Sequence, residues 1–532
     1  MFGLWEGMTL TFSGNDSPSP RAGWSRRSFG TLGLGSALGL ALAAKPFAAR
    51  ADNGIGAWSG LYPWPLIPLH AMLLPSGTVM SYGSSGTGQQ TGMFIYDVWD
   101  PQYGPGAGHA TLPNGTGTDL FCSAQIILPQ SNDVFLAGGD IWNGVSTTGT
   151  GNPHTITFDP DTNTLIPGPD MSRPRWYATL TTLPNGEIYV QGGRQTASQG
   201  TATGIDLAEV RAADGSLRPL LGMSTAGLSY WYPRNWVAPD GRIFGYAFRK
   251  MYYVNPTGLG TLTMAGALPK GGPDGVTSSE VMYRPGKILR CGGGAYAGWS
   301  DQPAVAAAYT IDINGTKPKV TATSPMPLPL SWHNATVVPD GRVVVTGGSY
   351  LANQLVGVND RAFIWDPNTG AWTVGAATTS GRARMYHSIG LLLPDATILV
   401  GGGGAGGNAP QTNLDAEIYY PPYLFDATGQ FAPRPRIVSG ATELRYATQH
   451  QVKVDNGAAI ARVTLIKTGS VTHSFNMEQR FMDLLFTVSG NIVKFRSPAN
   501  ANLAPPGRYM LFVLNAQGVP SIARMVSILP KV

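Results

Sequence analysis

A hairpin-forming unit recurs seven times along this 532-residue chain, and this repeat limits the fold more than any other feature of the sequence. Each copy has an apolar strand, a turn that contains Pro and usually Gly, Asn or Asp, and a second apolar strand that ends in small residues. Pro fixes φ and Gly or Asn supplies positive φ, so each turn predicts a tight β-hairpin. The copies span residues 71–83, 123–139, 178–193, 235–245, 280–293, 334–348 and 388–402.

The spacing of the copies predicts the architecture. The first glycine after each hairpin lies at position 83, 138, 192, 245, 292, 347 or 401, so successive copies are 47 to 55 residues apart. Seven units of this length are typical of kelch-like β-propeller blades. A β-solenoid is the structural alternative. It would not explain why reactive side chains, described below, occupy the same position in most copies of the repeat.

The pattern changes after Phe425. A Pro-Arg-Pro-Arg segment at 433–436 marks a linker, and residues 437–529 contain short alternating strands without the glycine pair. This pattern favours a separate β-sandwich of about 100 residues. The sequence therefore predicts an all-β protein, with a seven-bladed kelch-like propeller over 52–432 and a C-terminal immunoglobulin-like sandwich over 433–532.

The first residues have the features of a targeting segment. Arg26-Arg27 precedes an apolar run over 30–44, and Ala49-Arg50-Ala51 resembles a cleavage site. We expect a twin-arginine signal peptide over 1–51, and export of the mature chain to the periplasm or the medium. The apolar run of about 15 residues is short for a membrane span, so an uncleaved anchor is the less favoured alternative.

Composition limits the partners of the mature chain. Residues 1–51 hold five of the 36 Lys and Arg and two of the 31 Asp and Glu, so their removal leaves a net charge of +2. The chain contains no basic run, which argues against a nucleic-acid partner. We expect a monomer that has no membrane contact after signal cleavage.

Reactive side chains occupy equivalent positions in the repeats. The residue seven places before the hairpin Pro is a thiol, a phenol, an indole or an imidazole in five of the seven copies, namely Cys122, Tyr177, Tyr232, Trp332 and His387. In a propeller, equivalent positions near the start of the inner strand lie on one ring around the axis. The repeat therefore predicts that these residues meet at one mouth of the propeller, near its axis, with Tyr386 beside His387.

Each of these residues alone has an ordinary structural interpretation, such as core packing. Cys122 could also form a disulfide with Cys291 in an exported protein. Blades 2 and 5 are not neighbours in a seven-membered ring, however, so a Cα separation below about 7 Å is improbable.

Several segments carry a family resemblance. They are Phe121-Cys122, residues 173–178 around Tyr177, residues 384–389 around His387, residues 415–424, Thr472-His473-Ser474 with 478–480, and the strand 506–515. Together they resemble the galactose oxidase/glyoxal oxidase family of copper-radical oxidases. The resemblance extends from about Trp58 to the C-terminus and includes both predicted domains.

The resemblance implies a mechanism and a set of roles. His387 and His473 would be the nitrogen ligands of one copper ion. Tyr177 would be an equatorial ligand joined to Cys122 by a thioether, which forms a protein-derived radical cofactor. Tyr386 would be the axial ligand and the base. The substrate would be an aldehyde, a primary alcohol or a sugar terminus, and O2 would be reduced to H2O2.

One departure from the family limits the prediction of the substrate. Galactose oxidase has a tryptophan, stacked on the cross-linked tyrosine, where this chain has Arg194-Gln195. The register leaves Trp176, Tyr232, Trp332 and His333 as candidates for the substrate pocket. The blade 3 motif and the missing tryptophan favour an aldehyde, as in glyoxal oxidase.

Two other functions remain as alternatives. One is a non-catalytic kelch-type module that binds carbohydrate or protein, which would not need the five reactive residues together. The other is a hydrolytic zinc site, which is weaker because no carboxylate shares the ring register.

Overall fold

The computed structural model of the chain describes residues 54–196, 204–269, 276–294, 303–404 and 411–530. These residues form β-strands, loops and three short 3-10 helices, η1 (Pro101–Tyr103), η2 (Pro422–Leu424) and η3 (Gly457–Ala459), with no α-helix. The predicted signal peptide, 1–51, lies outside the described residues. Among the described residues, no helix has the length and apolar character needed to cross a membrane.

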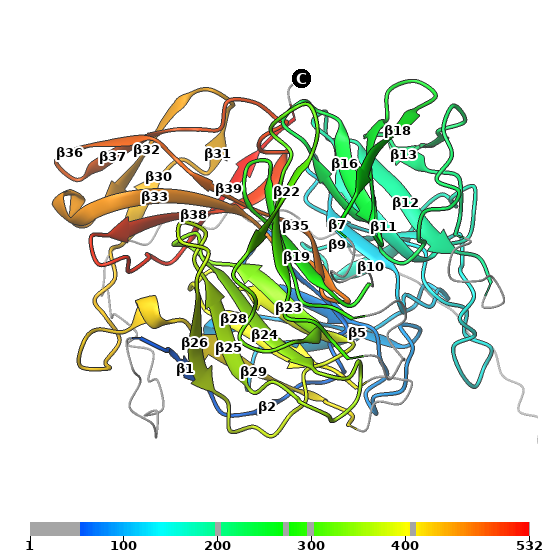
Figure 1. Ribbon diagram of the computed structural model, residues 1–532, viewed down its shortest axis with the longest axis horizontal. Helices are drawn as coiled ribbons and strands as arrows, with labels where there is room; N and C mark the ends of the chain where they lie inside the picture. Colours follow the sequence, from blue (N-terminus) through cyan, green and yellow to red (C-terminus); the bar gives the residue numbers. More distant parts are fainter. Residues whose placement is uncertain (1–53, 197–203, 270–275, 295–302, 405–410, 531–532) are drawn as a thin grey trace, which may run out of the picture. The chain divides into compact units, whose positions relative to one another are not determined.

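Seven antiparallel blades follow one another along the described chain, which confirms the predicted propeller (Figure 1). Blades 1 and 5 belong to one larger sheet, in which strands of the C-terminal domain join them. Blade 1 has strands β3 (His70–Leu73), β4 (Val79–Tyr82), β5 (Ile95–Trp99) and β6 (His109–Pro113), and blade 2 has β7 (Ala124–Ile127), β8 (Val134–Ala137), β9 (Thr155–Asp159) and β10 (Thr164–Pro167). Blade 3 has β11 (Trp176–Thr182), β12 (Ile188–Arg194), β13 (Glu209–Arg211) and β14 (Leu217–Pro219), and blade 4 has β15 (Arg234–Val237), β16 (Ile243–Ala247), β17 (Lys250–Asn255) and β18 (Thr261–Ala267). Blade 5 has β19 (Ser279–Arg284), β20 (Lys287–Cys291), β21 (Ala308–Asp312) and β22 (Lys319–Thr323), and blade 6 has β23 (Ser331–Val337), β24 (Val343–Ser349), β25 (Arg361–Trp365) and β26 (Trp372–Ala377).

The last blade joins the two ends of the propeller. It consists of β27 (Ser388–Leu392), β28 (Ile398–Gly402), β29 (Asp415–Tyr420) and the N-terminal strand β1 (Ala57–Trp58). Strand β1 pairs antiparallel with β29, and β2 (Tyr62–Pro63) pairs with the same strand. Because the outer strand of blade 7 comes from the start of the described chain, the ring is closed by main-chain hydrogen bonds.

The C-terminal residues form the predicted sandwich of two sheets. One sheet has the order β30 (Ile437–Gly440), β32 (Gln449–Val454), β37 (Ile492–Arg496) and β36 (Phe486–Ser489). The other contains β31 (Glu443–Leu444), β39 (Arg524–Ile528), β38 (Gly507–Asn515), β33 (Ile460–Lys467) and β35 (Phe475–Asp483). Apolar side chains such as Val452, Val463 and Phe495 form one buried cluster between the strands. The exact domain boundaries at 52 and 433 remain predictions.

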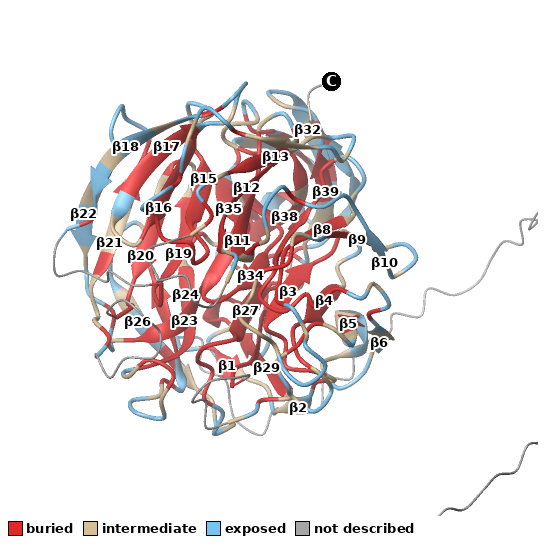
Figure 2. Ribbon diagram, turned by 90° about the vertical axis from the view of Figure 1, so that its right-hand side faces the viewer, coloured by how far each residue is buried: buried red, intermediate tan, exposed pale blue. Residues whose placement is uncertain are grey.

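A hairpin of the sandwich enters the propeller. Its strands are β34 (Ser470–Thr472) and β35. Strand β34 pairs antiparallel with β3 of blade 1, and β35 pairs in parallel with β19 of blade 5. Figure 2 shows both strands in the buried interior, among inner strands of the blades. The turn between them, His473-Ser474, is therefore carried into the ring of inner strands.

A buried ion pair anchors this hairpin. The Nζ atom of Lys467 lies 2.6 Å from Oε1 of Glu478, and both side chains are almost fully buried. Glu478 also accepts hydrogen bonds from the Ile127 amide (3.3 Å) of blade 2 and the Thr182 hydroxyl (3.2 Å) of blade 3. The carboxylate thus links the sandwich to two blades.

We expect Glu478→Gln to lower the free energy of unfolding substantially. The substitution leaves the Lys467 ammonium buried without a counter-charge, which costs roughly 3 kcal/mol. Denaturant unfolding of the purified protein measures the effect. The matched control is Asp483→Asn on the same strand, because Asp483 pairs with Arg462 in solvent and should contribute less than about 1 kcal/mol. Equal losses in the two variants would contradict the anchoring role.

Candidate metal centre

The five reactive residues that lie seven places before a hairpin Pro share an unusual backbone conformation. Cys122, Tyr177, Tyr232, Trp332 and His387 all have positive φ, between 38° and 74°. Side chains of this size seldom adopt that region, and each instance costs on the order of 1–3 kcal/mol. The same left-handed residue therefore recurs where the chain enters an inner strand, and strain of this kind clusters at functional sites.

Main-chain hydrogen bonds connect these residues from blade to blade. The amide of Tyr177 donates to the carbonyl of Cys122 (3.1 Å), and the amide of Tyr232 donates to the carbonyl of Tyr177 (3.0 Å). Blades 2, 3 and 4 are joined in this way around the axis. Cys122 and Tyr177, which are 55 positions apart in the sequence, are thus held side by side.

Two phenols meet near the axis. The hydroxyl oxygens of Tyr177 and Tyr386 lie 2.6 Å apart, and both side chains are buried. Trp231 stacks flat on the Tyr177 ring, with a centroid separation of 4.6 Å and an interplanar angle of 9°. Trp332 packs against Tyr386 at 4.6 Å. The phenol pair is therefore enclosed by indole rings.

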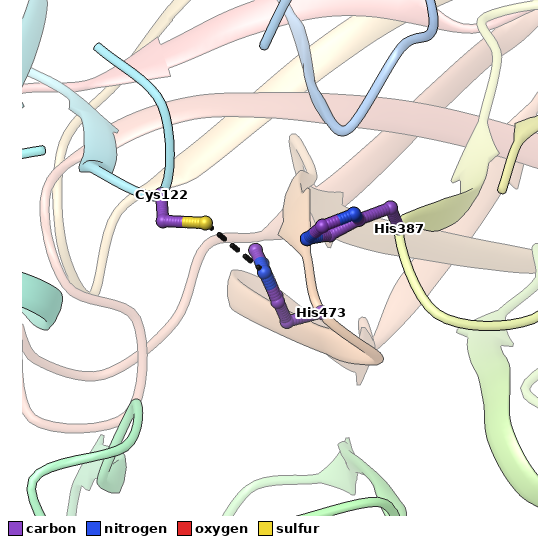
Figure 3. A group of neighbouring side chains, drawn as sticks. All are labelled: Cys122, His387 and His473. Atoms are coloured by element: carbon purple, nitrogen blue, oxygen red, sulfur yellow. Dashed lines mark hydrogen bonds between the residues drawn. The ribbon is translucent and has the colours of Figure 1, made fainter. Parts of the chain in front are cut away.

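Two imidazoles and a thiol complete the cluster (Figure 3). One ligand atom from each of Cys122, His387 and His473 lies within 4.8 Å of the others. The Nε2 atom of His473 is 3.5 Å from the Cys122 sulfur. Its Nδ1 atom is 2.5 Å from the Thr472 hydroxyl, so the hairpin itself fixes the orientation of the ring. The His473 ring also lies 5.1 Å from that of Tyr386.

The electrostatics of the site favour a bound cation. Burial, followed by the proximity of His387, holds the pKa of His473 well below its usual range, so its imidazole is neutral and keeps a nitrogen lone pair that can bind a metal ion. Burial raises the pKa values of Tyr177 and Tyr386 well above their usual range. Both phenols therefore stay protonated unless a nearby positive charge stabilises the phenolate.

The donor set fits copper. Two imidazoles and two phenol oxygens provide the nitrogen and oxygen ligands suited to tetragonal Cu(II). Cys122 and Cys291 are both free and buried, so neither is used in the disulfide considered from the sequence. A Cys-His-His group is also a possible zinc set, but the two adjacent phenols have no role in such a site.

The four predicted pocket residues differ in position. Trp176 lies against Tyr177, with ring centroids 4.1 Å apart, and Trp332 borders Tyr386 as described above. The Tyr232 hydroxyl donates to the carbonyl of Ser123 (3.0 Å), and its ring packs on His473. The structure places the His333 ring elsewhere, with Nε2 3.5 Å from the sulfur of Cys291.

Sequence reasoning missed Trp231. The family resemblance places the tryptophan that stacks on the cross-linked tyrosine after the glycine pair of blade 3, where this chain has Arg194. The indole comes instead from the next blade, one position before Tyr232. A usable signal was present, because Trp231 occupies in blade 4 the same repeat position that Tyr386 occupies in blade 7.

Comparison with known proteins assigns the family. A sequence profile described as "Glyoxal oxidase N-terminus" matches residues 110–423, which is more than half of the chain. The chain belongs to the glyoxal oxidase family. A second profile, "Galactose oxidase-like, Early set domain", matches residues 434–528. The prediction of an oxidoreductase of the galactose oxidase/glyoxal oxidase type is confirmed.

Relatives of this member of the glyoxal oxidase family are named for different substrates. Galactose oxidase of Gibberella zeae is 28% identical over 511 residues, covering 89% of this chain and 71% of the relative. Aldehyde oxidase GLOX of Vitis pseudoreticulata is 26% identical over 452 residues, covering 78% of this chain and 82% of the relative. The solved structure of a fungal alcohol oxidase in complex with copper matches 89% of this chain and all of its own, with 25% identity and a TM-score of 0.78.

Proposed function

We propose that the protein is a copper-radical oxidase that oxidises a small aldehyde, or a primary alcohol, and reduces O2 to H2O2. The observation that carries the proposal is the Tyr177–Tyr386 hydroxyl pair, 2.6 Å apart, in one buried cluster with His387, His473 and Cys122. A binding module has no need for two phenols, two imidazoles and a thiol at one point, four of them on residues with positive φ. The names of the relatives, which are oxidases of galactose, aldehydes and alcohols, support the same proposal.

His387, His473, Tyr177 and Tyr386 would hold one copper ion. When bound, copper supplies a one-electron acceptor and a Lewis acid, and it favours the phenolate forms of the two tyrosines. The buried site excludes water from the reacting groups, which strengthens every charge interaction within it. The hairpin carries His473 to the propeller, so both domains contribute to this ligand set.

Cys122 and Tyr177 would form the second redox centre. A thioether between the sulfur and the phenol ring replaces one S–H and one C–H bond, and O2 takes the two electrons and two protons as H2O2. The sulfur donates electron density to the ring, so a phenoxyl radical forms more readily. Trp231 covers one face of that ring and would limit its reaction with other molecules.

Tyr386 would act as the base. It is positioned by Trp332 and by its hydrogen bond to Tyr177. It would take the hydroxyl proton of an alcohol or of a hydrated aldehyde. The substrate carbon then loses one hydrogen, and the two electrons and two protons released match the reduction of one O2 to one H2O2.

The direct test is a peroxide-coupled assay of copper-loaded protein with aldehydes and primary alcohols. We expect peroxide with at least one small aldehyde and none without copper. A folded, copper-loaded protein that produces no peroxide with any member of the panel would instead favour the kelch-type binding module.

We also propose that the chain is exported by the twin-arginine route, on the basis of Arg26-Arg27 and the apolar run after it. We expect the N-terminus of the mature protein near Asp52. Intact-mass spectrometry of protein recovered from the periplasm or medium measures this position. Retention of the Arg26-Arg27 segment in that material would contradict cleavage.

A further inference from the structure

An arginine stacks on the indole that packs against Tyr177, and no acidic residue of the described ranges forms an ion pair with it. Arg194 is the last residue of β12 and pairs with Trp176 across the hairpin of blade 3. Its guanidinium carbon lies 4.3 Å from the centroid of the Trp176 ring and 5.2 Å from that of Tyr230. Trp176 in turn packs against Tyr177, so one ring separates the positive charge from the proposed radical.

Several buried hydrogen-bond donors of Arg194 and of the indoles around the phenol pair have no partner among the described residues. Within the described part of the chain, Arg194 forms no ion pair, and its Nε atom is buried without a hydrogen-bond partner. The indole nitrogens of Trp231 and Trp332, which can only donate, are also buried without a partner there. Buried donors of this kind are costly unless a ligand satisfies them.

Charge complementarity identifies the missing acceptor. A guanidinium presents its N–H groups in a planar fork that matches a carboxylate, and such charge-assisted hydrogen bonds are stronger than neutral ones.

We propose that Arg194 is a specificity-determining residue that selects small aldehydes that carry a carboxylate. Because a single ring, that of Trp176, lies between the guanidinium and Tyr177, the test uses the smallest such aldehyde, in which the carboxylate is bonded to the aldehyde carbon. This inference rests on the proposed oxidase function and adds to it the charge of the substrate.

The test compares two substrates with the same number of non-hydrogen atoms. Glyoxylate carries a carboxylate where methylglyoxal carries an acetyl group. In Arg194→Gln we expect the ratio of kcat/KM for glyoxylate to that for methylglyoxal to fall about 10- to 100-fold, as for loss of a charge-assisted hydrogen bond. Arg194→Lys, which keeps the charge but not the fork, should give an intermediate ratio.

Arg173→Gln is the matched control. Arg173 is an exposed arginine next to the same blade that donates a hydrogen bond to the carbonyl of the adjacent Ser172 (3.0 Å), so its replacement removes the same charge at a site away from the phenol pair. The substrate ratio in this variant should equal that of the unmodified protein. An equal fall in both variants would show a general charge effect and overturn the proposal.

A binding measurement separates this inference from the proposed function. Oxamate is an anion of similar size that has no aldehyde, and its binding to copper-free protein can be followed by the fluorescence of the tryptophans. We expect binding that weakens at least about tenfold in Arg194→Gln. Oxidation of both aldehydes with an unchanged ratio and unchanged oxamate binding would overturn the role of Arg194 alone. Absence of oxidation with intact oxamate selectivity would overturn only the oxidase proposal.

Discussion

Replacement of His473 by Ala is expected to abolish copper binding and oxidase activity while the propeller remains folded. The imidazole is held at the tip of the β34–β35 hairpin and points at Cys122. Loss of a residue that merely orients a ligand lowers metal affinity about 10- to 100-fold, so loss of a ligand should cost more than about 100-fold. Calorimetric titration with copper measures the affinity, and thermal unfolding followed by circular dichroism measures the fold.

His450→Ala is the control for this substitution. His450 is a partly buried imidazole on β32 of the same domain and is not part of the metal cluster, so its removal should leave copper affinity unchanged. A truncation before Pro433 extends the test, because it deletes His473 but keeps the other three proposed ligands. Copper binding at full affinity by His473→Ala, or by a folded truncated propeller, would contradict the ligand set.

Replacement of Cys122 by Ser is expected to separate copper binding from turnover. The sulfur is not one of the four proposed ligands, so copper affinity should change by less than about tenfold, which corresponds to about 1.4 kcal/mol. Without the thioether the Tyr177 radical is harder to form, and kcat should fall at least about 100-fold, which corresponds to about 2.7 kcal/mol in the barrier. Steady-state assays of peroxide release and copper titration measure the two quantities.

Cys291→Ser provides the matched control for that experiment. Cys291 is equally buried but lies beside His333, so the same substitution there should leave turnover per folded molecule unchanged. If Cys122→Ser loses copper affinity and turnover together, the sulfur is itself a ligand, and a Cys-His-His metal site replaces the radical centre.

The repeat explains how much of the site was predictable. Counting from the hairpin Pro located Cys122, Tyr177 and His387 because a propeller converts an equivalent sequence position into an equivalent place on the ring. All three have positive φ at the start of an inner strand. The prediction needed only local turn chemistry and the symmetry of the fold.

The remaining features depend on contacts that no local pattern encodes. His473 was identified by family resemblance alone, since nothing in residues 470–483 predicts that β34 pairs with β3 and β35 with β19. The Glu478–Lys467 ion pair with its bonds to blades 2 and 3 depends on the same docking. Trp231 was missed because the ring that covers Tyr177 comes from the neighbouring blade.

The covalent state of Cys122 tests the central claim most directly. Peptide mapping by mass spectrometry is applied to active, copper-loaded protein after full reduction and alkylation. We predict that the Cys122 and Tyr177 peptides are recovered as one species, lighter than their sum by two hydrogens, and that this species forms only after exposure to copper and O2. Recovery of Cys122 as a free, alkylated thiol in active protein would contradict the radical-cofactor account.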